Sequence, residues 1–195
     1  MPKIVDADLR RRDIVEAVFR LVIRDGVQSA SLRKVADEAG LNVGSVRHYF
    51  DSHEDLLRCA AQSVVDRISA RIEAHVARLD GVADRRPVVE DMLAELLPLD
   101  ERRRDECTIA FAFVCESRWN PELRPLAEQV LTGPRRLVRR VADAAGIEDR
   151  DDHVERLCAL IDGLAFKGAF APAIDDPGAH LRLVREQLDH MYASR

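Results

Sequence analysis

The chain has 195 residues, 47% of them hydrophobic and 33% charged, which suits one large domain or two smaller ones with a sizeable core. It has no run near the roughly 18 apolar residues of a membrane span and no apolar signal segment at its N-terminus, so we expect a cytoplasmic protein without membrane contact. The net charge of −5 hides a basic module, because residues 9–50 hold eight basic and five acidic residues, a net +3 that is compatible with phosphate binding at one end of the chain.

Periodic apolar residues predict helices along almost the whole sequence. In chain order we expect helices over residues 8–25, about 31–39, 43–49, 53–79, 87–97, 101–118, 121–146, 151–170 and 177–192. Glycine and proline separate these segments, and Gly133-Pro134 is expected to kink the seventh helix. Because no strand-like alternation occurs, the predicted fold class is all-α.

The cysteines and acidic runs give no firm sign of a metal or cofactor. Cys59, Cys107, Cys115 and Cys158 are scattered and form no CxxC pair. Most of them fall on helical patterns, which indicates small buried side chains in a reducing compartment, with a redox switch as the alternative. The run Asp151-Asp152-His153 could hold a metal, but acidic residues are also the ordinary start of a helix. We therefore predict no metal and no cofactor.

The second and third helices, joined by Gly40-Leu41-Asn42, form a predicted helix-turn-helix. Gly40 can adopt the positive φ that a tight turn between crossing helices often requires. Val46 and Phe50 are expected to face the first helix, which leaves a polar outer face: Asn42, Gly44, Ser45, Arg47, His48 and Tyr49. A helix in the major groove needs a small residue near the DNA, donors to phosphate and a side chain that reaches base edges. Arg47 is the best candidate base reader, because its guanidinium can bond guanine O6 and N7 together.

The run SLRKVADEAGLNVGSVRHYFDSHEDLL, residues 31–57, resembles the DNA-binding signature of the tetracycline-repressor (TetR) family, and residues 9–26 resemble that family's first helix. The resemblance implies phosphate contacts from Ser31, Ser45 and Tyr49 and base contacts around Gly44, Arg47 and His48. The candidate DNA-binding residues are Ser31, Arg33, Asn42, Gly44, Ser45, Arg47, His48, Tyr49 and His53. His53 departs from the family, which usually has lysine there, so DNA binding is expected to be weaker or to strengthen as pH falls through the histidine range.

The resemblance also implies a DNA-binding domain over residues 1–51 and a ligand-binding and dimerisation domain over residues 52–195. Two apolar stripes in the last two helices support a homodimer independently. The predicted interface residues are Val154, Leu157, Ile161, Leu164, Gly168, Leu181, Val184, Leu188 and Met191. The alternative is that these stripes face only the chain's own core.

The ligand pocket is less readable from the sequence. The segment from Trp119 to Ala165 resembles the C-terminal domain of the family branch that includes the choline/betaine regulator, but this likeness does not assign choline as ligand. The candidate pocket residues are His75, Met92, Phe111, Cys115, Arg118 and Trp119. Such residues are more often plain core than ligand contacts.

We therefore predict a ligand-responsive transcriptional regulator. A homodimer would place two copies of the third helix in successive major grooves of a palindromic double-stranded DNA operator, about 35 Å apart. The resemblance favours a repressor released by a small-molecule inducer of unknown identity. An activator of the same fold, and a small-molecule-binding protein without DNA affinity, are the alternatives. An enzyme is not expected, because no HExxH motif, phosphate-binding glycine loop or catalytic spacing of His, Cys and Ser occurs.

Overall fold

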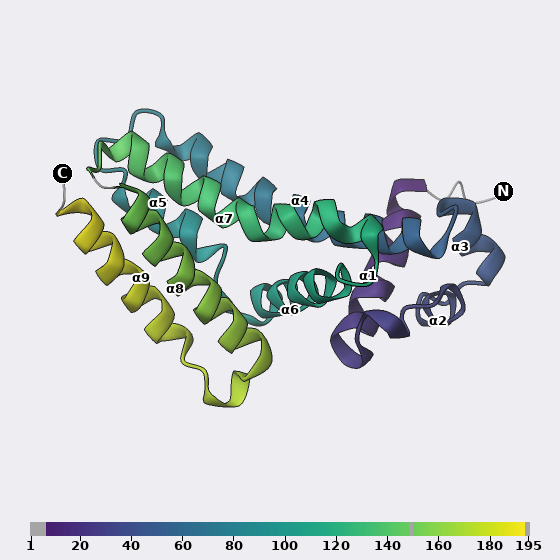
Figure 1. The fold of residues 1–195 in the computed structure, drawn as a ribbon. Helices are drawn as coiled ribbons and strands as arrows, with labels where there is room; N and C mark the ends of the chain where they lie inside the picture. Colours follow the sequence, from purple (N-terminus) through teal and green to yellow (C-terminus); the bar gives the residue numbers. More distant parts are fainter. Residues whose placement is uncertain (1–6, 149, 194–195) are drawn as a thin grey trace. The chain divides into compact units, whose positions relative to one another are not determined.

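The computed structural model describes residues 7–148 and 150–193. Every regular element within these residues is helical and none is a strand (Figure 1), which confirms the predicted all-α class. The α-helices are α1 (Ala7–Asp25), α2 (Leu32–Glu38), α3 (Val43–Tyr49), α4 (His53–Val76), α5 (Arg86–Ala94), α6 (Glu101–Glu116), α7 (Arg124–Ala145), α8 (Arg150–Phe170) and α9 (Pro177–Tyr192). No helix among the described residues is both long and apolar enough to cross a membrane.

The short 3-10 segments among the described residues are η1 (Val27–Ser29), η2 (Ala77–Leu79), η3 (Pro121–Leu123) and η4 (Pro172–Ile174). Two of them, η2 and η3, account for the earlier end of α4 and the later start of α7 than predicted, while α5 and α6 end two or three residues early without such a segment. The Asn120 side chain caps η3 instead of an α-helix, because its oxygen accepts from the backbone N–H of Glu122 at 3.1 Å. Helix α7 then runs through Pro134 without a break, although proline has no N–H to donate to the preceding turn.

The chain forms two compact units. The first comprises the described residues up to Val65 together with Ile109–Ala127, and the second comprises Asp66–Thr108 with the described residues from Glu128 onward. Helices α4, α6 and α7 each contribute to both units. The sequence predicted a domain boundary at residue 52. The two compact units do not test it, so that boundary stays a prediction.

The first unit packs α1 against α2, and α2 against α3. The predicted apolar stripe of α1 is buried, at Ile14, Ala17, Val18, Leu21 and Val22. From the other two helices Val35, Ala36 and Val46 contribute side chains with no exposed surface, and Phe50 follows with 1%. Two seven-residue helices are too short to be stable alone, so this shared core holds the helix-turn-helix in place.

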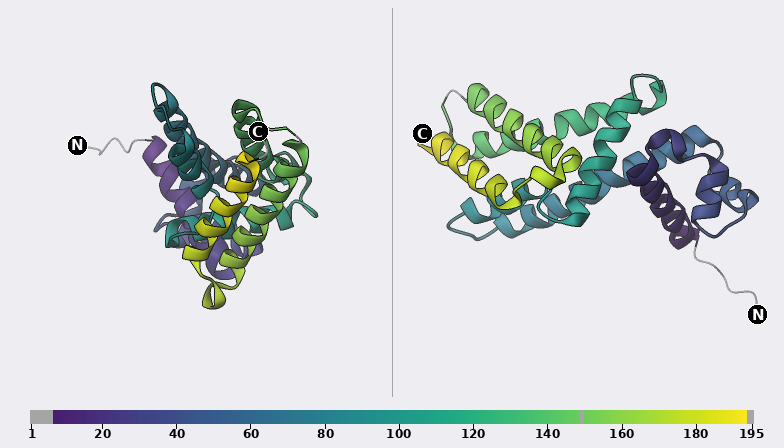
Figure 2. Two further views of the ribbon diagram at one scale, coloured as in Figure 1. Left: turned by 90° about the vertical axis from the view of Figure 1, so that its left-hand side faces the viewer. Right: turned by 90° about the horizontal axis from the view of Figure 1, so that it is seen from below.

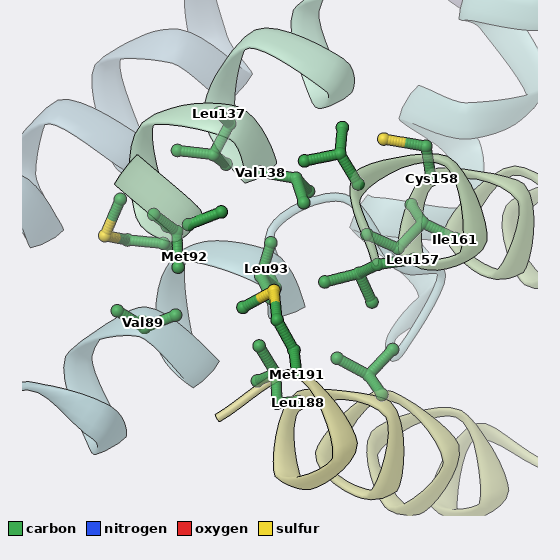
Figure 3. Close-up of a cluster of buried hydrophobic side chains, with 14 of the residues drawn as sticks. Val89, Met92, Leu93, Leu137, Val138, Leu157, Cys158, Ile161, Leu188 and Met191 are labelled. Atoms are coloured by element: carbon green, nitrogen blue, oxygen red, sulfur yellow. The ribbon is translucent and has the colours of Figure 1, made fainter. Parts of the chain in front are cut away.

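The second unit has its own apolar core, supplied mainly by α5, α7, α8 and α9. In Figure 3 the side chains of Leu93, Val138, Leu157 and Leu188, one from each of these helices, converge with their neighbours. Helices α8 and α9 lie side by side in Figure 1 and in both views of Figure 2. Their shared contact is therefore formed within one chain.

The two stripes predicted as a dimer interface are part of this internal core. The buried members are Val154, Leu157, Ile161, Leu164, Gly168, Val184, Leu188 and Met191, and Leu181 is half-buried. Most of these side chains have at most 1% of their surface exposed, which leaves almost nothing for a partner to contact. The observation matches the alternative interpretation of the sequence, in which both stripes face the chain's own core.

The predicted small residues of α8 have different surroundings. A Cβ at Gly168 would lie 2.3 Å from Cγ of Pro98, so this glycine allows the Pro98 ring to pack on α8. A Cβ at Gly163 would meet nothing within 4 Å, and Gly163 is exposed. Of the two, Gly163 is available to another molecule.

Candidate DNA-reading surface

The turn between α2 and α3 has the geometry that the sequence predicted. Gly40 has φ +66°, a left-handed conformation that favours glycine. The N–H of Leu41 donates to the carbonyl of Ala36 at 2.8 Å, and the N–H of Gly40 donates to that of Asp37 at 3.2 Å. This pair of bonds is the Schellman arrangement, which satisfies the last carbonyls of α2. The chain therefore leaves α2 in a fixed direction and enters α3 after the four residues 39–42.

Side-chain caps start both helices. Ser31 Oγ accepts from the N–H of Lys34 at 3.3 Å and opens α2. Asn42 Oδ1 accepts from the N–H of Ser45 at 2.8 Å and from its hydroxyl at 3.1 Å, and opens α3. A Cβ at Gly44 would lie 3.2 Å from the same Asn42 oxygen. Glycine at this position thus suits the cap as well as a close approach of DNA.

The remaining outer face of α3 is exposed, while its inner face is closed. Arg47 and His48 are exposed, Ser45 and Tyr49 are partly covered, and Val46 has no exposed surface. The His48 and Tyr49 rings meet edge to face with centroids 5.2 Å apart. Arg33 on α2 is also exposed. The structure therefore brings the predicted polar residues of α3 to one accessible side of a helix anchored by Val46.

His53 makes an internal contact that the sequence did not indicate. Its Nε2 lies 3.0 Å from the carbonyl oxygen of Ala30 and, when it carries the proton, donates to it. Ala30 has no exposed surface and directly precedes the cap of α2. The ring thus ties the first turn of α4 to the start of α2. The DNA contact predicted for His53 stays a prediction, and it would have to be made by the other ring nitrogen, Nδ1.

Ion pairs between α1 and α2 also support the reading helices, and sequence reasoning missed them. Arg20 Nε lies 2.7 Å from Glu38 Oε1, and Arg24 Nη1 lies 3.2 Å from Glu38 Oε2. The hydrogen bond from Arg20 is the main cause of the lowered pKa of Glu38. Opposite charges on the two packed helices were the available signal, but pairing them requires the angle at which the helices cross.

The six candidate pocket residues belong to different units. His75 and Met92 lie in the second unit, whereas Phe111, Cys115, Arg118 and Trp119 lie in the first. Met92 is 4% exposed and packs in the apolar core shown in Figure 3. Trp119 is 75% exposed, with the Arg118 guanidinium 6.0 Å from its ring centroid. Neither unit by itself brings the six together.

His75 instead belongs to a charged network in the second unit. Arg78 Nη1 lies 3.0 Å from His75 Nδ1, and His75 Nε2 lies 3.4 Å from Glu95 Oε1. Arg71 forms ion pairs with both glutamates: its Nε lies 2.7 Å from Glu95 Oε2, and its Nη2 lies 2.5 Å from Glu106 Oε2. The guanidinium of Arg71 therefore neutralises two poorly exposed carboxylates, Glu95 immediately after α5 and Glu106 on α6.

Comparisons with known proteins agree with this geometry. The sequence profile described as "Bacterial regulatory proteins, tetR family" matches residues 14–60, and that described as "BetI-type transcriptional repressor, C-terminal" matches residues 85–193. The transcriptional regulator PksA of Bacillus subtilis is 32% identical over 88% of this chain and 84% of its own length. The regulator BetI of Paraburkholderia phytofirmans is 27% identical over the full length of both.

Two solved structures have the same fold. A transcriptional regulator from Rhodococcus sp. Rha1 superposes with a TM-score of 0.80 at 25% identity, covering 93% of this chain and 95% of that one. A regulator from Saccharomonospora viridis, in complex with choline, gives a TM-score of 0.74 at 24% identity over 94% and 97%. The chain therefore belongs to the TetR family of bacterial transcriptional regulators, with a C-terminal region of the BetI type.

Proposed function

We propose that this TetR-family regulator is a cytoplasmic homodimeric repressor that binds a palindromic operator through α3 and leaves it when a small-molecule inducer binds. The observation that carries the proposal is the exposed outer face of α3 above a fully buried Val46. A helix so anchored can enter a major groove without rearranging its own core. The family supports the general function, and the residues below are our assignment.

Arg47 is the proposed base-reading residue. It is exposed near the middle of α3, and no hydrogen bond or ion pair engages its side chain within the described part of the chain. The guanidinium is therefore available to bond guanine O6 and N7. Ser45 and Tyr49 flank it on the same helix, Ser31 caps α2 and Arg33 lies in its first turn. These four residues are proposed to contact phosphate.

The test is a binding titration against DNA from upstream of the chain's own gene. Arg47→Ala should cost about 1–3 kcal/mol and reduce discrimination between the operator and operators with single base changes. Arg140→Ala is the matched control, since it removes one exposed arginine from the second unit. Equal weakening on every DNA sequence would instead make Arg47 a phosphate contact.

Whether the protein represses or activates transcription needs a separate measurement. In vitro transcription from the operator-bearing promoter should fall when the protein is added. Any compound that restores transcription should also lower operator affinity, typically by a coupling free energy of about 1–3 kcal/mol. An increase in transcription on adding the protein alone would contradict repression and favour an activator.

We propose that the dimer interface is formed by a second stripe of α8, which is exposed and lies on a different face of the helix from the buried stripe. Ala159, Gly163, Phe166 and Phe170 follow at steps of four, three and four residues, all exposed. Phe166 and Phe170 keep 58% and 50% of their surface, and Leu183 of α9 keeps 40%. Clustered large apolar side chains in water mark an interaction surface, and the open backbone at Gly163 allows close helix approach.

The dimer face can be tested by sedimentation equilibrium. Phe166→Glu should shift the protein toward monomer at micromolar concentration, because the partner would have to bury a carboxylate. Leu131→Glu on α7 replaces a comparably exposed side chain, with 56% of its surface free, and should leave the dimer intact. If Phe166→Glu remains dimeric, the interface lies elsewhere.

A further inference from the structure

The C-terminal end of the reading helix is held by a residue of α1. Helix α3 has only seven residues and ends at Tyr49. The last carbonyls of any α-helix lack partners within the helix, and a helix this short has little stability of its own. The orientation of α3 therefore depends on the contacts at its two ends as well as on the buried Val46. Asn42 fixes the first end, as described above.

Arg11 fixes the other end through three contacts. Its Nη1 donates to the carbonyl oxygen of Tyr49 at 3.0 Å. The guanidinium carbon lies 4.6 Å from the centroid of the Phe50 ring, which is 1% exposed. Its Nη2 donates to Sγ of Cys59 on α4 at 3.0 Å. One planar group thus joins α1 to the last residue of α3, to the residue after it and to α4, all within the first unit.

We propose that Arg11 is a positioning residue for DNA reading: it sets the orientation of α3 without contacting DNA. A positive charge stabilises a helix C-terminus through the helix dipole, and both of its Nη groups are engaged in protein contacts. Lysine carries the same charge, but it has neither the planar fork nor the stacking face that the three contacts use. The inference rests on the proposed role of α3 as the DNA reader.

Arg12 provides a matched control next to Arg11. It is exposed on the same helix, and its side chain makes no hydrogen bond, ion pair or ring contact among the described residues. Arg11→Ala and Arg12→Ala therefore change the net charge equally. A difference between them reports the contacts of Arg11 and not the overall field that attracts DNA.

The experiment measures operator affinity as a function of salt for Arg11→Ala, Arg11→Lys and Arg12→Ala. We expect both Arg11 variants to weaken binding roughly three- to tenfold, the range for losing contacts of this kind. The slope of log K against log salt should stay at the wild-type value for both. Loss of a direct phosphate contact would reduce that slope by about 0.9 per contact. A reduced slope for Arg11→Ala, or wild-type affinity for Arg11→Lys, would overturn the proposal.

Hydrogen exchange of the DNA-free protein separates orientation from folding. In Arg11→Lys the amides of α3 should exchange faster while those of α1 and α2 keep their protection, and Arg12→Ala should leave all three helices unchanged. Unchanged exchange in α3 would overturn the inference, as would equal loss of protection in all three helices. If Arg47→Ala leaves binding intact while α3 still responds to Arg11→Lys, it is the proposed role of α3 that fails, and the structural role of Arg11 stands.

Discussion

Replacing either of two glycines of α8 by alanine should change the free energy of unfolding, but in opposite directions. In Gly168→Ala the new methyl would lie 2.3 Å from Cγ and 3.0 Å from Cβ of Pro98, and 3.0 Å from Oδ2 of Asp175. The proline ring is rigid, and Asp175 is held by a 2.8 Å contact with the buried His180. None of these neighbours can rotate away, so something in the backbone must shift. In Gly163→Ala the methyl meets nothing within 4 Å.

The magnitudes follow from two opposing terms. Alanine stabilises a helix interior by about 0.5–1 kcal/mol relative to glycine, and this term applies at both positions. Forcing one extra carbon into a packed site costs about 1–3 kcal/mol, and this term applies only at Gly168. At mid-range the two terms give a net loss of about 1 kcal/mol for Gly168→Ala, and the first term alone gives a gain of about 0.5–1 kcal/mol for Gly163→Ala.

Urea unfolding followed by circular dichroism is the assay, supported by thermal melting. For a chain of this length about 1 kcal/mol corresponds to a shift in Tm of roughly 2–4 °C. Measurements at several protein concentrations separate folding from dimerisation, since Gly163 lies on the proposed dimer face. A Gly168→Ala protein as stable as the wild type would refute the reasoning, because Pro98 would then not be packed tightly on α8.

The charged network and the thiols give the remaining predictions. Arg71→Met should destabilise the fold by about 3–5 kcal/mol in urea unfolding, because it leaves a buried carboxylate uncompensated; a loss below 1 kcal/mol would contradict this. Burial alone would raise the pKa of Glu95, but hydrogen bonds from Arg71 and from a histidine lower it below the ordinary 4.5. Its stabilising contribution should therefore be complete above about pH 4.5 and disappear as pH falls through the lowered folded-state pKa, and acid titration of Arg71→Met should lack this component. Burial raises the pKa of Cys107 to about 12, so a disulfide reagent at pH 8 should label the exposed Cys115 first and Cys107 only on unfolding.

Local signals explain why the reading module could be predicted from sequence. A cap such as Ser31 or Asn42 acts within three residues of its own position, and the positive φ of Gly40 is a property of one residue. These effects do not depend on what the rest of the chain does. The predicted bounds of α3 were therefore met at both ends.

Other assignments, such as the dimer interface and the role of His53, depend on long-range contacts, and the sequence alone does not predict these. A periodic stripe shows that a helix has an apolar face, but not whether its own chain or a partner covers that face. On α8 the stripe through Leu157 packs internally, and the stripe through Phe166 stays exposed. His53 raises the same difficulty, since its contact is with the carbonyl of Ala30, twenty-three residues earlier. Only the packing of α4 beside the start of α2 brings those two groups together.

The same limit applies to counting charge in the basic module. Residues 9–50 hold eight arginine and lysine residues, and such a count suggests eight potential phosphate contacts. Arg11 is engaged with Tyr49 and Cys59, and Arg20 and Arg24 both bind Glu38. Much of the positive charge thus holds helices together, and only exposed side chains without a protein partner can release counterions from DNA. In the proposed interface, arginine both builds the surface that would read DNA and supplies the side chains that would bind it, so the charge counted from the sequence overstates the part proposed to face DNA.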